Sequence, residues 1–154
     1  APDALENTGW GNMLDRRAVN TEHGRLTMWI RLRDALDPAN AEINHCGLAF
    51  ISDSVPTGAV RATHPHKVAN REESHQAFSG ASLDHSIYFH RVVDPTEWLL
   101  ADVVCHSFVE ARGLTVGNLF DTSGLHIATI VQEALLRERR PEGGGSDGLA
   151  GKVV

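Results

Sequence analysis

The stretch HCGLAFISD, residues 45–53, ends in a carboxylate where an apolar helix pattern predicts one more apolar side chain. The residues three, seven and ten positions before Asp53 are apolar, and these spacings fall on one stripe of a helix: Phe50, Cys46 and Ile43. We expect this stripe to face the core. Asp53 would then place a negative charge at the negative end of the helix dipole, partly out of water. A carboxylate kept there is a candidate general base, and a solvated residue at the helix end is the alternative.

Gln132 is a polar residue on a strand face that is otherwise apolar. In the segment ATIVQEALL it occupies alternate positions with three apolar residues: Ala128, Ile130 and Ala134. A polar side chain on such a face needs a hydrogen-bond partner. Because a glutamine amide both donates and accepts, Gln132 can bind a water and a carboxylate together.

Other kinds of catalytic chemistry have weaker support. His64 and His66 could be a pair of metal ligands, but no third ligand stands at a recognisable spacing, so we expect no metal and no other cofactor. Cys46 and Cys105 lie in apolar runs without a CxxC pattern, which is typical of free, buried thiols in a reducing cytoplasm. Neither cysteine has a recognisable base, and there is no GxSxG motif, so a nucleophilic triad is not expected.

The helix that would carry the candidate base is predicted over residues 38–53. Asp37 suits the N-cap and Pro38 suits the first helical position. Before this helix, residues 25–34 alternate between apolar and other side chains, which predicts a half-buried strand. After it, residues 54–80 are rich in turn formers and are interpreted as a long functional or mobile loop.

Four strand candidates follow the loop, separated by short connectors of the hairpin kind: residues 82–92, 97–111, 113–124 and 125–137. The last of them also fits a helix, but its β-branched start and its place after a meander favour a strand. One helix against one antiparallel sheet predicts the α+β class. We expect one domain over residues 25–138, after a lead-in or linker over 1–24 and before a disordered, Gly-rich tail over 139–154.

Composition narrows the class of protein. The 154 residues are 42% hydrophobic, enough for one sizeable core, and the net charge of -6 argues against nucleic acid as a partner. No apolar run approaches the ~18 residues of a membrane span, and the first residues have no signal-peptide character. We therefore expect a cytoplasmic protein without a membrane span.

Several segments together resemble the second half of the type II acyl-CoA thioesterases, which carry two hotdog domains in one chain. The resemblance runs from about Thr27 to Arg137, through HCGLAFISD, ASLDHSIYFHR, EWLLADV, ARG and ATIVQEALLR. It implies the hotdog fold, in which a curled antiparallel sheet wraps one long central helix. It also implies hydrolysis of fatty acyl-CoA to free fatty acid and CoA.

The resemblance assigns roles to three residues. In that family a carboxylate, a hydroxyl residue and a glutamine hold the hydrolytic water, and the matching positions are Asp53, Ser82 and Gln132. The family often has Thr where this chain has Ser82. Strand parity gives Ser82 no support, because it shares a face with polar residues rather than with the apolar ones. Asp84 and His85 point to opposite faces of a strand and are expected to make structural hydrogen bonds.

The resemblance also bears on substrate and partners. Arg61, Lys67 and Arg71 could meet the phosphates of CoA, with a solvated loop as the alternative. The first hotdog half of the family is absent, so we expect a homo-oligomer or pairing with a separate first half. A non-catalytic acyl-CoA-binding or scaffolding half is the alternative function. A hydratase or dehydratase would need an Asp and His pair, and none stands at an interpretable spacing.

Overall fold

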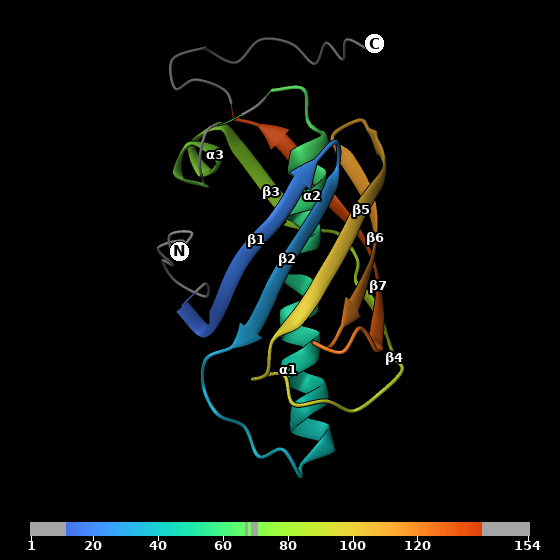
Figure 1. Cartoon of the computed structure of the whole chain (residues 1–154). Helices are drawn as coiled ribbons and strands as arrows, with labels where there is room; N and C mark the ends of the chain where they lie inside the picture. The colour runs from blue at the N-terminus through green and yellow to red at the C-terminus, as the bar shows by residue number, and fades with distance from the viewer. Residues whose placement is uncertain (1–11, 67, 69–70, 140–154) are drawn as a thin grey trace, which may run out of the picture.

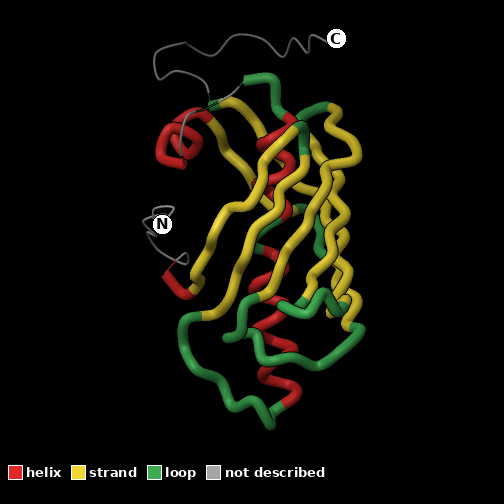
Figure 2. The backbone as a smooth tube through the Cα atoms, in the orientation of Figure 1, coloured by secondary structure: helices red, strands yellow, loops and turns green. Residues whose placement is uncertain are grey.

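One antiparallel sheet curls around a helix in this computed structural model, which describes residues 12–66, 68 and 71–139 (Figure 1). The sheet has seven strands in the order β1-β2-β5-β6-β7-β3, and β4 also pairs with β7. Figure 2 shows the strands wrapped around the helical segment like a partly closed sleeve. This is the hotdog architecture, so the predicted α+β class and fold are confirmed.

The predicted strand over residues 25–34 is confirmed as β2 (Arg25–Leu32). Its apolar positions are buried in alternation, as the sequence pattern requires: Leu26, Met28, Ile30 and Leu32. These side chains face the central helix and belong to a core cluster with residues of β5, β6 and β7. Burial of one face of the sheet therefore fixes the register of β2.

The lead-in expected over residues 1–24 is wrong for its second half, because Leu14–Glu22 forms strand β1 and pairs with β2. Only Leu14 of this strand is buried. An edge strand held mainly by backbone hydrogen bonds needs no apolar alternation, and so its sequence gave no strand signal. The expected tail lies outside the described residues, except for Arg139.

Helix α1 (Ala41–Asp53) begins three residues later than predicted. Asn40 is the N-cap, since its side chain accepts a hydrogen bond from the N–H of Ile43. Asp37, the predicted cap, instead accepts from the N–H of Ala39 and closes a turn before the helix. The predicted end of the helix at Asp53 is confirmed.

The prediction that the Asp53 stripe of α1 faces the core is wrong. The buried residues of α1 lie on another stripe: Asn44, Gly47, Leu48, Ile51 and Ser52. A Cβ at Gly47 would lie 2.8 Å from side-chain atoms of Leu32 and Pro95, so this position of the buried face has room only for glycine. Ile43 and Cys46 are exposed, which also corrects the expected burial of the Cys46 thiol; Cys105 is half-buried.

The long loop expected over residues 54–80 is also wrong, because this segment forms three elements: α2 (Pro56–Thr63), α3 (Arg71–Ala77) and β3 (Phe78–Ser82). Pro56 stands at the start of α2, where proline is compatible with a helix. A Cβ at Gly58 would lie 2.6 Å from Leu26, so this glycine allows α2 to approach the sheet. Pro56 and Gly58, which were interpreted as turn formers, thus begin helix α2 and allow its close contact with the sheet.

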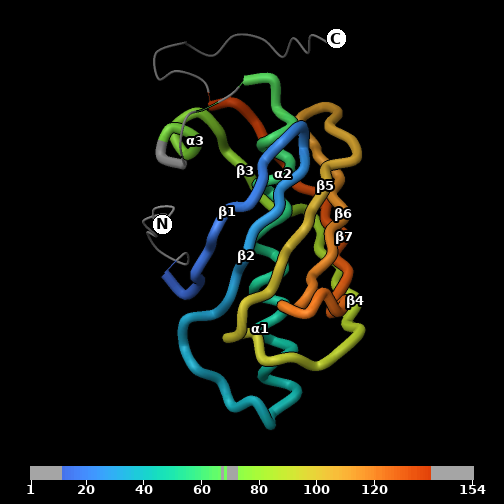
Figure 3. The backbone as a smooth tube through the Cα atoms, viewed as in Figure 1, coloured from blue at the N-terminus to red at the C-terminus, as the bar shows by residue number. Residues whose placement is uncertain are grey.

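The remaining strands are β4 (Ser86–Phe89), β5 (Leu99–Val109), β6 (Arg112–Phe120) and β7 (His126–Glu138). The strand interpretation of the last segment is confirmed. However, β4 does not form a hairpin with β5. It pairs with the first half of β7, beside β3, which pairs with the second half. In Figure 3 the connection from β4 crosses over α1 to reach β5.

Two further points concern the whole fold. The core lies between α1, α2 and the concave face of the sheet, with Ile51, Leu119 and Ile127 fully buried. Among the described residues, no helix is long and apolar enough to cross a membrane.

Candidate active site

The three residues assigned by resemblance lie in one hydrogen-bonded chain. The hydroxyl of Ser82 donates to Oδ1 of Asp53 at 3.0 Å. The amide Nε2 of Gln132 donates to Oγ of Ser82 at 2.6 Å. These side chains come from the end of α1, the end of β3 and the middle of β7, so the fold joins three elements at one point.

Ser82 reaches Asp53 although its strand parity argued against it. Ser82 is the last residue of β3 and is paired with Ala134 of β7. Alternation of faces holds along a regular strand, and β3 ends at this residue. The parity argument from Asp84, two residues later, therefore did not apply.

A break between β3 and β4 shapes the site. Residues 83–85 belong to neither strand. Leu83 N–H still donates to the Glu133 carbonyl at 2.9 Å, and the Asp84 carboxylate accepts from the Glu133 N–H at 2.7 Å. The Asp84 side chain thus replaces a backbone acceptor of the sheet. This confirms its predicted structural role, and the irregular backbone lets His85 turn inward.

His85 extends the chain of hydrogen bonds and was missed as a site residue by sequence reasoning. Its Nδ1 lies 2.8 Å from Oε1 of Gln132, and its Nε2 lies 2.8 Å from Oγ of Ser52. The continuous path therefore runs from Ser52 through His85, Gln132 and Ser82 to Asp53. A histidine next to Asp84 in the SLDH segment was visible in the sequence, but its partner on β7 is 47 positions away.

The side chains of this path range from fully buried to exposed. Ser52 and Gln132 are fully buried, whereas Asp53 and Ser82 are exposed. The expected burial of Gln132 is therefore confirmed. The carboxylate stands at the C-terminal end of α1 and at the open end of the path, where a water and a substrate can reach it. The buried end is fixed by fully partnered polar groups.

Only one of the three residues expected to meet CoA phosphates can be placed. Arg61 lies on α2 and lines a cavity. Lys67 lies outside the described residues. Arg71 is the first residue of α3, and only its backbone is described.

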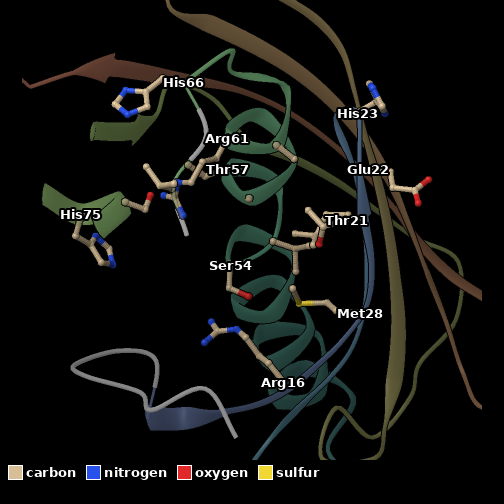
Figure 4. A pocket seen from close by; sticks show the side chains of 16 residues that line it. Arg16, Thr21, Glu22, His23, Met28, Ser54, Thr57, Arg61, His66 and His75 are labelled. Atoms are coloured by element: carbon tan, nitrogen blue, oxygen red, sulfur yellow. The ribbon is translucent and has the colours of Figure 1, made fainter. Parts of the chain in front are cut away.

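The cavity has a volume of about 760 Å³ and lies between α2, α3, β1 and β2 (Figure 4). Ser54 and Thr57 line it, so its wall begins one residue after Asp53. Charged or titratable side chains reach it from several elements: Arg16, Glu22, His23, Arg61, His66 and His75. Figure 4 shows Arg16 and Arg61 at the two ends of the row formed by Ser54 and Thr57. The cavity therefore combines positive side chains with proximity to the candidate base.

The two histidines considered as metal ligands have other contacts. His66 Nδ1 lies 3.1 Å from Glu138 Oε1, and the His64 ring packs edge-on against Phe78 and Phe108. Within the described part of the chain, no group of three or more His, Cys, Asp or Glu side chains is placed to hold a metal ion.

Comparison with known protein families shows to which family this chain belongs. The family described as "Acyl-CoA thioesterase C-terminal domain" matches residues 2–136. The chain belongs to this acyl-CoA thioesterase family. The match includes β1, in agreement with the place of that strand in the sheet.

Curated relatives share this name. The chain is 35% identical over 100 residues to acyl-CoA thioesterase 2 of Haemophilus influenzae, covering 65% of this chain and 33% of the relative. It is 29% identical over 109 residues to human acyl-coenzyme A thioesterase 8, covering 71% of this chain and 32% of the relative. The chain thus spans about a third of the length of these relatives.

Solved structures agree on the fold. The acyl-CoA thioesterase II TesB2 of Mycobacterium marinum is 28% identical with a TM-score of 0.70, covering 94% of this chain and 59% of that one. A protein from Alicyclobacillus acidocaldarius, described as having a hot dog fold, is 18% identical with a TM-score of 0.61, covering 83% of this chain and 47% of that one. The second likeness concerns the fold alone.

Proposed function

We propose that this chain is the hydrolytic hotdog of an acyl-CoA thioesterase, which converts fatty acyl-CoA to free fatty acid and CoA. The observation that carries the proposal is the hydrogen-bonded path from Gln132 through Ser82 to Asp53 in a member of this family. A carboxylate, a hydroxyl group and an amide held in one path can bind and orient a water.

In the proposed reaction Asp53 is the general base. It takes a proton from a water as the water oxygen bonds to the thioester carbonyl carbon, and the carbonyl electrons move to its oxygen. Collapse of this intermediate breaks the C–S bond, and the leaving thiolate receives the proton that Asp53 holds. Ser82 occupies one carboxylate oxygen of Asp53, and a carboxylate has further lone pairs to accept from the water. Backbone N–H groups would stabilise the oxyanion.

We also propose that CoA phosphates bind near Arg61, with Lys67 and Arg71 contributing from the following segment. Support comes from the cavity, which Arg61 lines and which begins one residue after Asp53. Guanidinium groups pair well with phosphate oxygens in two-point contacts.

A second hotdog would complete the site, either from another copy of this chain or from a separate first half. Support comes from large apolar side chains exposed between β3 and the end of β4: Leu83, Tyr88 and Phe89. Contiguous exposed apolar side chains mark interaction surfaces. The partner would cover the open end of the path at Asp53 and Ser82 and keep bulk water out.

A cytoplasmic location is part of the proposal. Cys46 and Cys105 are free thiols, and Cys46 is exposed. A reducing compartment preserves such thiols.

The test is release of free thiol from acyl-CoA substrates of 2 to about 18 carbons, at protein concentrations that span the monomer–oligomer transition. We expect turnover that rises with association. Absence of turnover at every concentration, with the chain folded and associated, would reject hydrolysis by this chain alone and favour the non-catalytic alternative.

A further inference from the structure

We propose that His85 is a positioning residue, which holds the side-chain amide of Gln132 in the one orientation that keeps Ser82 bonded to Asp53. The inference rests on the proposed function, because it names a residue that acts on the hydrolytic site through its neighbours. It depends on the direction of each hydrogen bond along the path, and this direction can be derived from the carboxylate.

The direction begins at Asp53. An ionised carboxylate only accepts hydrogen bonds, so the single hydroxyl proton of Ser82 points to Asp53 Oδ1. Ser82 can then only accept from Gln132, which must present its NH₂ group at 2.6 Å. The carbonyl Oε1 of the same amide consequently faces His85.

The next step fixes the proton on the histidine. Oε1 of Gln132 is an acceptor, so the Nδ1 atom of His85, 2.8 Å away, must carry a hydrogen and donate it. An imidazole in the other neutral tautomer would present a lone pair at Nδ1. The amide of Gln132 would then turn over, its oxygen would face Ser82, and the hydroxyl proton of Ser82 would be drawn away from Asp53.

Ser52 supports the histidine from the buried side of α1. Its Oγ lies 2.8 Å from His85 Nε2 and 2.7 Å from the carbonyl oxygen of Ala49. If the Ser52 proton goes to Nε2, His85 is neutral with its hydrogen on Nδ1. If it goes to the Ala49 carbonyl, Nε2 carries a hydrogen and donates to Ser52, and with Nδ1–H the ring is an imidazolium. In both arrangements Nδ1–H remains the donor to Gln132. The fully buried Ser52 therefore holds the ring in place without reversing the path.

Two substitutions distinguish the contribution of the Nδ1–H donor of His85 from that of its ring. His85→Phe keeps a ring of similar size and removes both nitrogens. His85→Asn places an amide N–H close to the position of Nδ1 and so keeps a donor for Gln132, while it loses the contact with Ser52. His90→Phe is the matched control, since His90 bonds Thr129 outside the path.

The experiment measures kcat and KM for acyl-CoA hydrolysis in the wild type, these variants, Gln132→Ala and the double variant His85→Phe/Gln132→Ala. We expect His85→Phe to lower kcat on the order of tenfold to a hundredfold with KM within about twofold. His85→Asn should recover most of kcat, and His90→Phe should match the wild type. In the Gln132→Ala background, His85→Phe should cause almost no further loss, because its effect passes through Gln132.

Three results would overturn the inference: unchanged kcat in His85→Phe, no recovery in a folded His85→Asn, or a full additional loss in the double variant. A wild type without activity would reject the proposed function instead. In that case, or if His85→Phe does not fold, nitrogen-15 NMR of the wild-type protein still tests the inference, because it shows which ring nitrogen of His85 carries a hydrogen. Protonated Nδ1 on His85 supports the inference, and a neutral ring protonated only on Nε2 rejects it.

Discussion

Ser82 Oγ lies 3.0 Å from Asp53 Oδ1 and joins the end of β3 to the end of α1. This contact brings the exposed carboxylate into a path of polar side chains that continues to the buried Gln132 and Ser52, with the half-buried His85 between them. A base on a helix terminus is thereby held by the sheet. The orientation of Asp53 therefore depends, through the exposed Ser82, on Gln132 in the core.

Gln132→Ala should lower kcat by about tenfold to a hundredfold, less than loss of the carboxylate. Gln132 orients the water together with Ser82, so part of the orientation survives its removal. Steady-state hydrolysis of acyl-CoA measures the effect, with Gln76→Ala on the exposed surface of α3 as the control. A Gln132→Ala variant more damaged than Asp53→Asn would reverse the roles assigned to the two residues.

Stability should depend on pH through the ion pair of Arg25 and Asp102. Arg25 donates to both oxygens of Asp102, at 2.8 and 2.6 Å, and these bonds lower the pKa of the Asp102 carboxyl from its ordinary value of 3.8. Burial acts in the opposite direction, and a hydrogen bond from Thr27 adds to the lowering. A depressed folded-state pKa contributes stability above the unfolded pKa, and this contribution is lost as the pH falls through the folded value.

Asp102→Asn should therefore lower the free energy of unfolding by up to about 1 kcal/mol at neutral pH, and the difference from wild type should shrink below about pH 4. Urea unfolding between pH 3 and pH 7 measures it. The double variant Arg25→Gln/Asp102→Asn should lose no more than Asp102→Asn alone. A difference that grows toward acid pH would contradict the assigned sign.

Association should depend on the apolar side chains exposed beside the site. Tyr88→Glu should weaken self-association, as should Leu83→Glu, because each places a charge at the proposed interface. Light scattering coupled to size exclusion at micromolar concentration measures the mass. Val109→Glu is the control, since Val109 is also exposed but ends β5, which β6 and β7 separate from β3 and β4. A fully active wild-type monomer would show that no second hotdog is needed.

Sequence reasoning predicted the elements with regular burial and missed those held by other means. Alternation predicted strand β2 and the apolar face that buries Gln132 in β7, because one side of each strand packs on the core. The strand at β7 itself was predicted from its β-branched start and its place after a meander. Strand β1 lacks that signal, since backbone pairing holds it at the edge. Helix α2 was hidden by Pro56 and Gly58, whose roles as a helix start and a close contact depend on the packed fold.

The residues of the site likewise include some that the sequence predicted and one that it missed. Asp53 stood out as an unexpected charge, but the reason given for it was wrong, because Ile43, Cys46 and Asp53 on its stripe are exposed. Ser82 came from the resemblance alone. His85 needed the break after β3, which no local pattern indicates, to reach a partner on β7. Long-range hydrogen bonds between irregular segments are the part that periodicity cannot predict.

Asp53→Asn tests the central claim most directly. The substitution keeps the size of the side chain and the ability to accept from Ser82, and it removes the charge that takes the proton from water. We expect thiol release from acyl-CoA to fall by about 10²–10⁴-fold with the melting temperature maintained, since general-base assistance is worth that much. Glu42→Gln, an exposed acid in the first turn of the same helix, should retain the wild-type rate. A folded Asp53→Asn variant that keeps more than about a tenth of the wild-type rate would show that Asp53 is not the base.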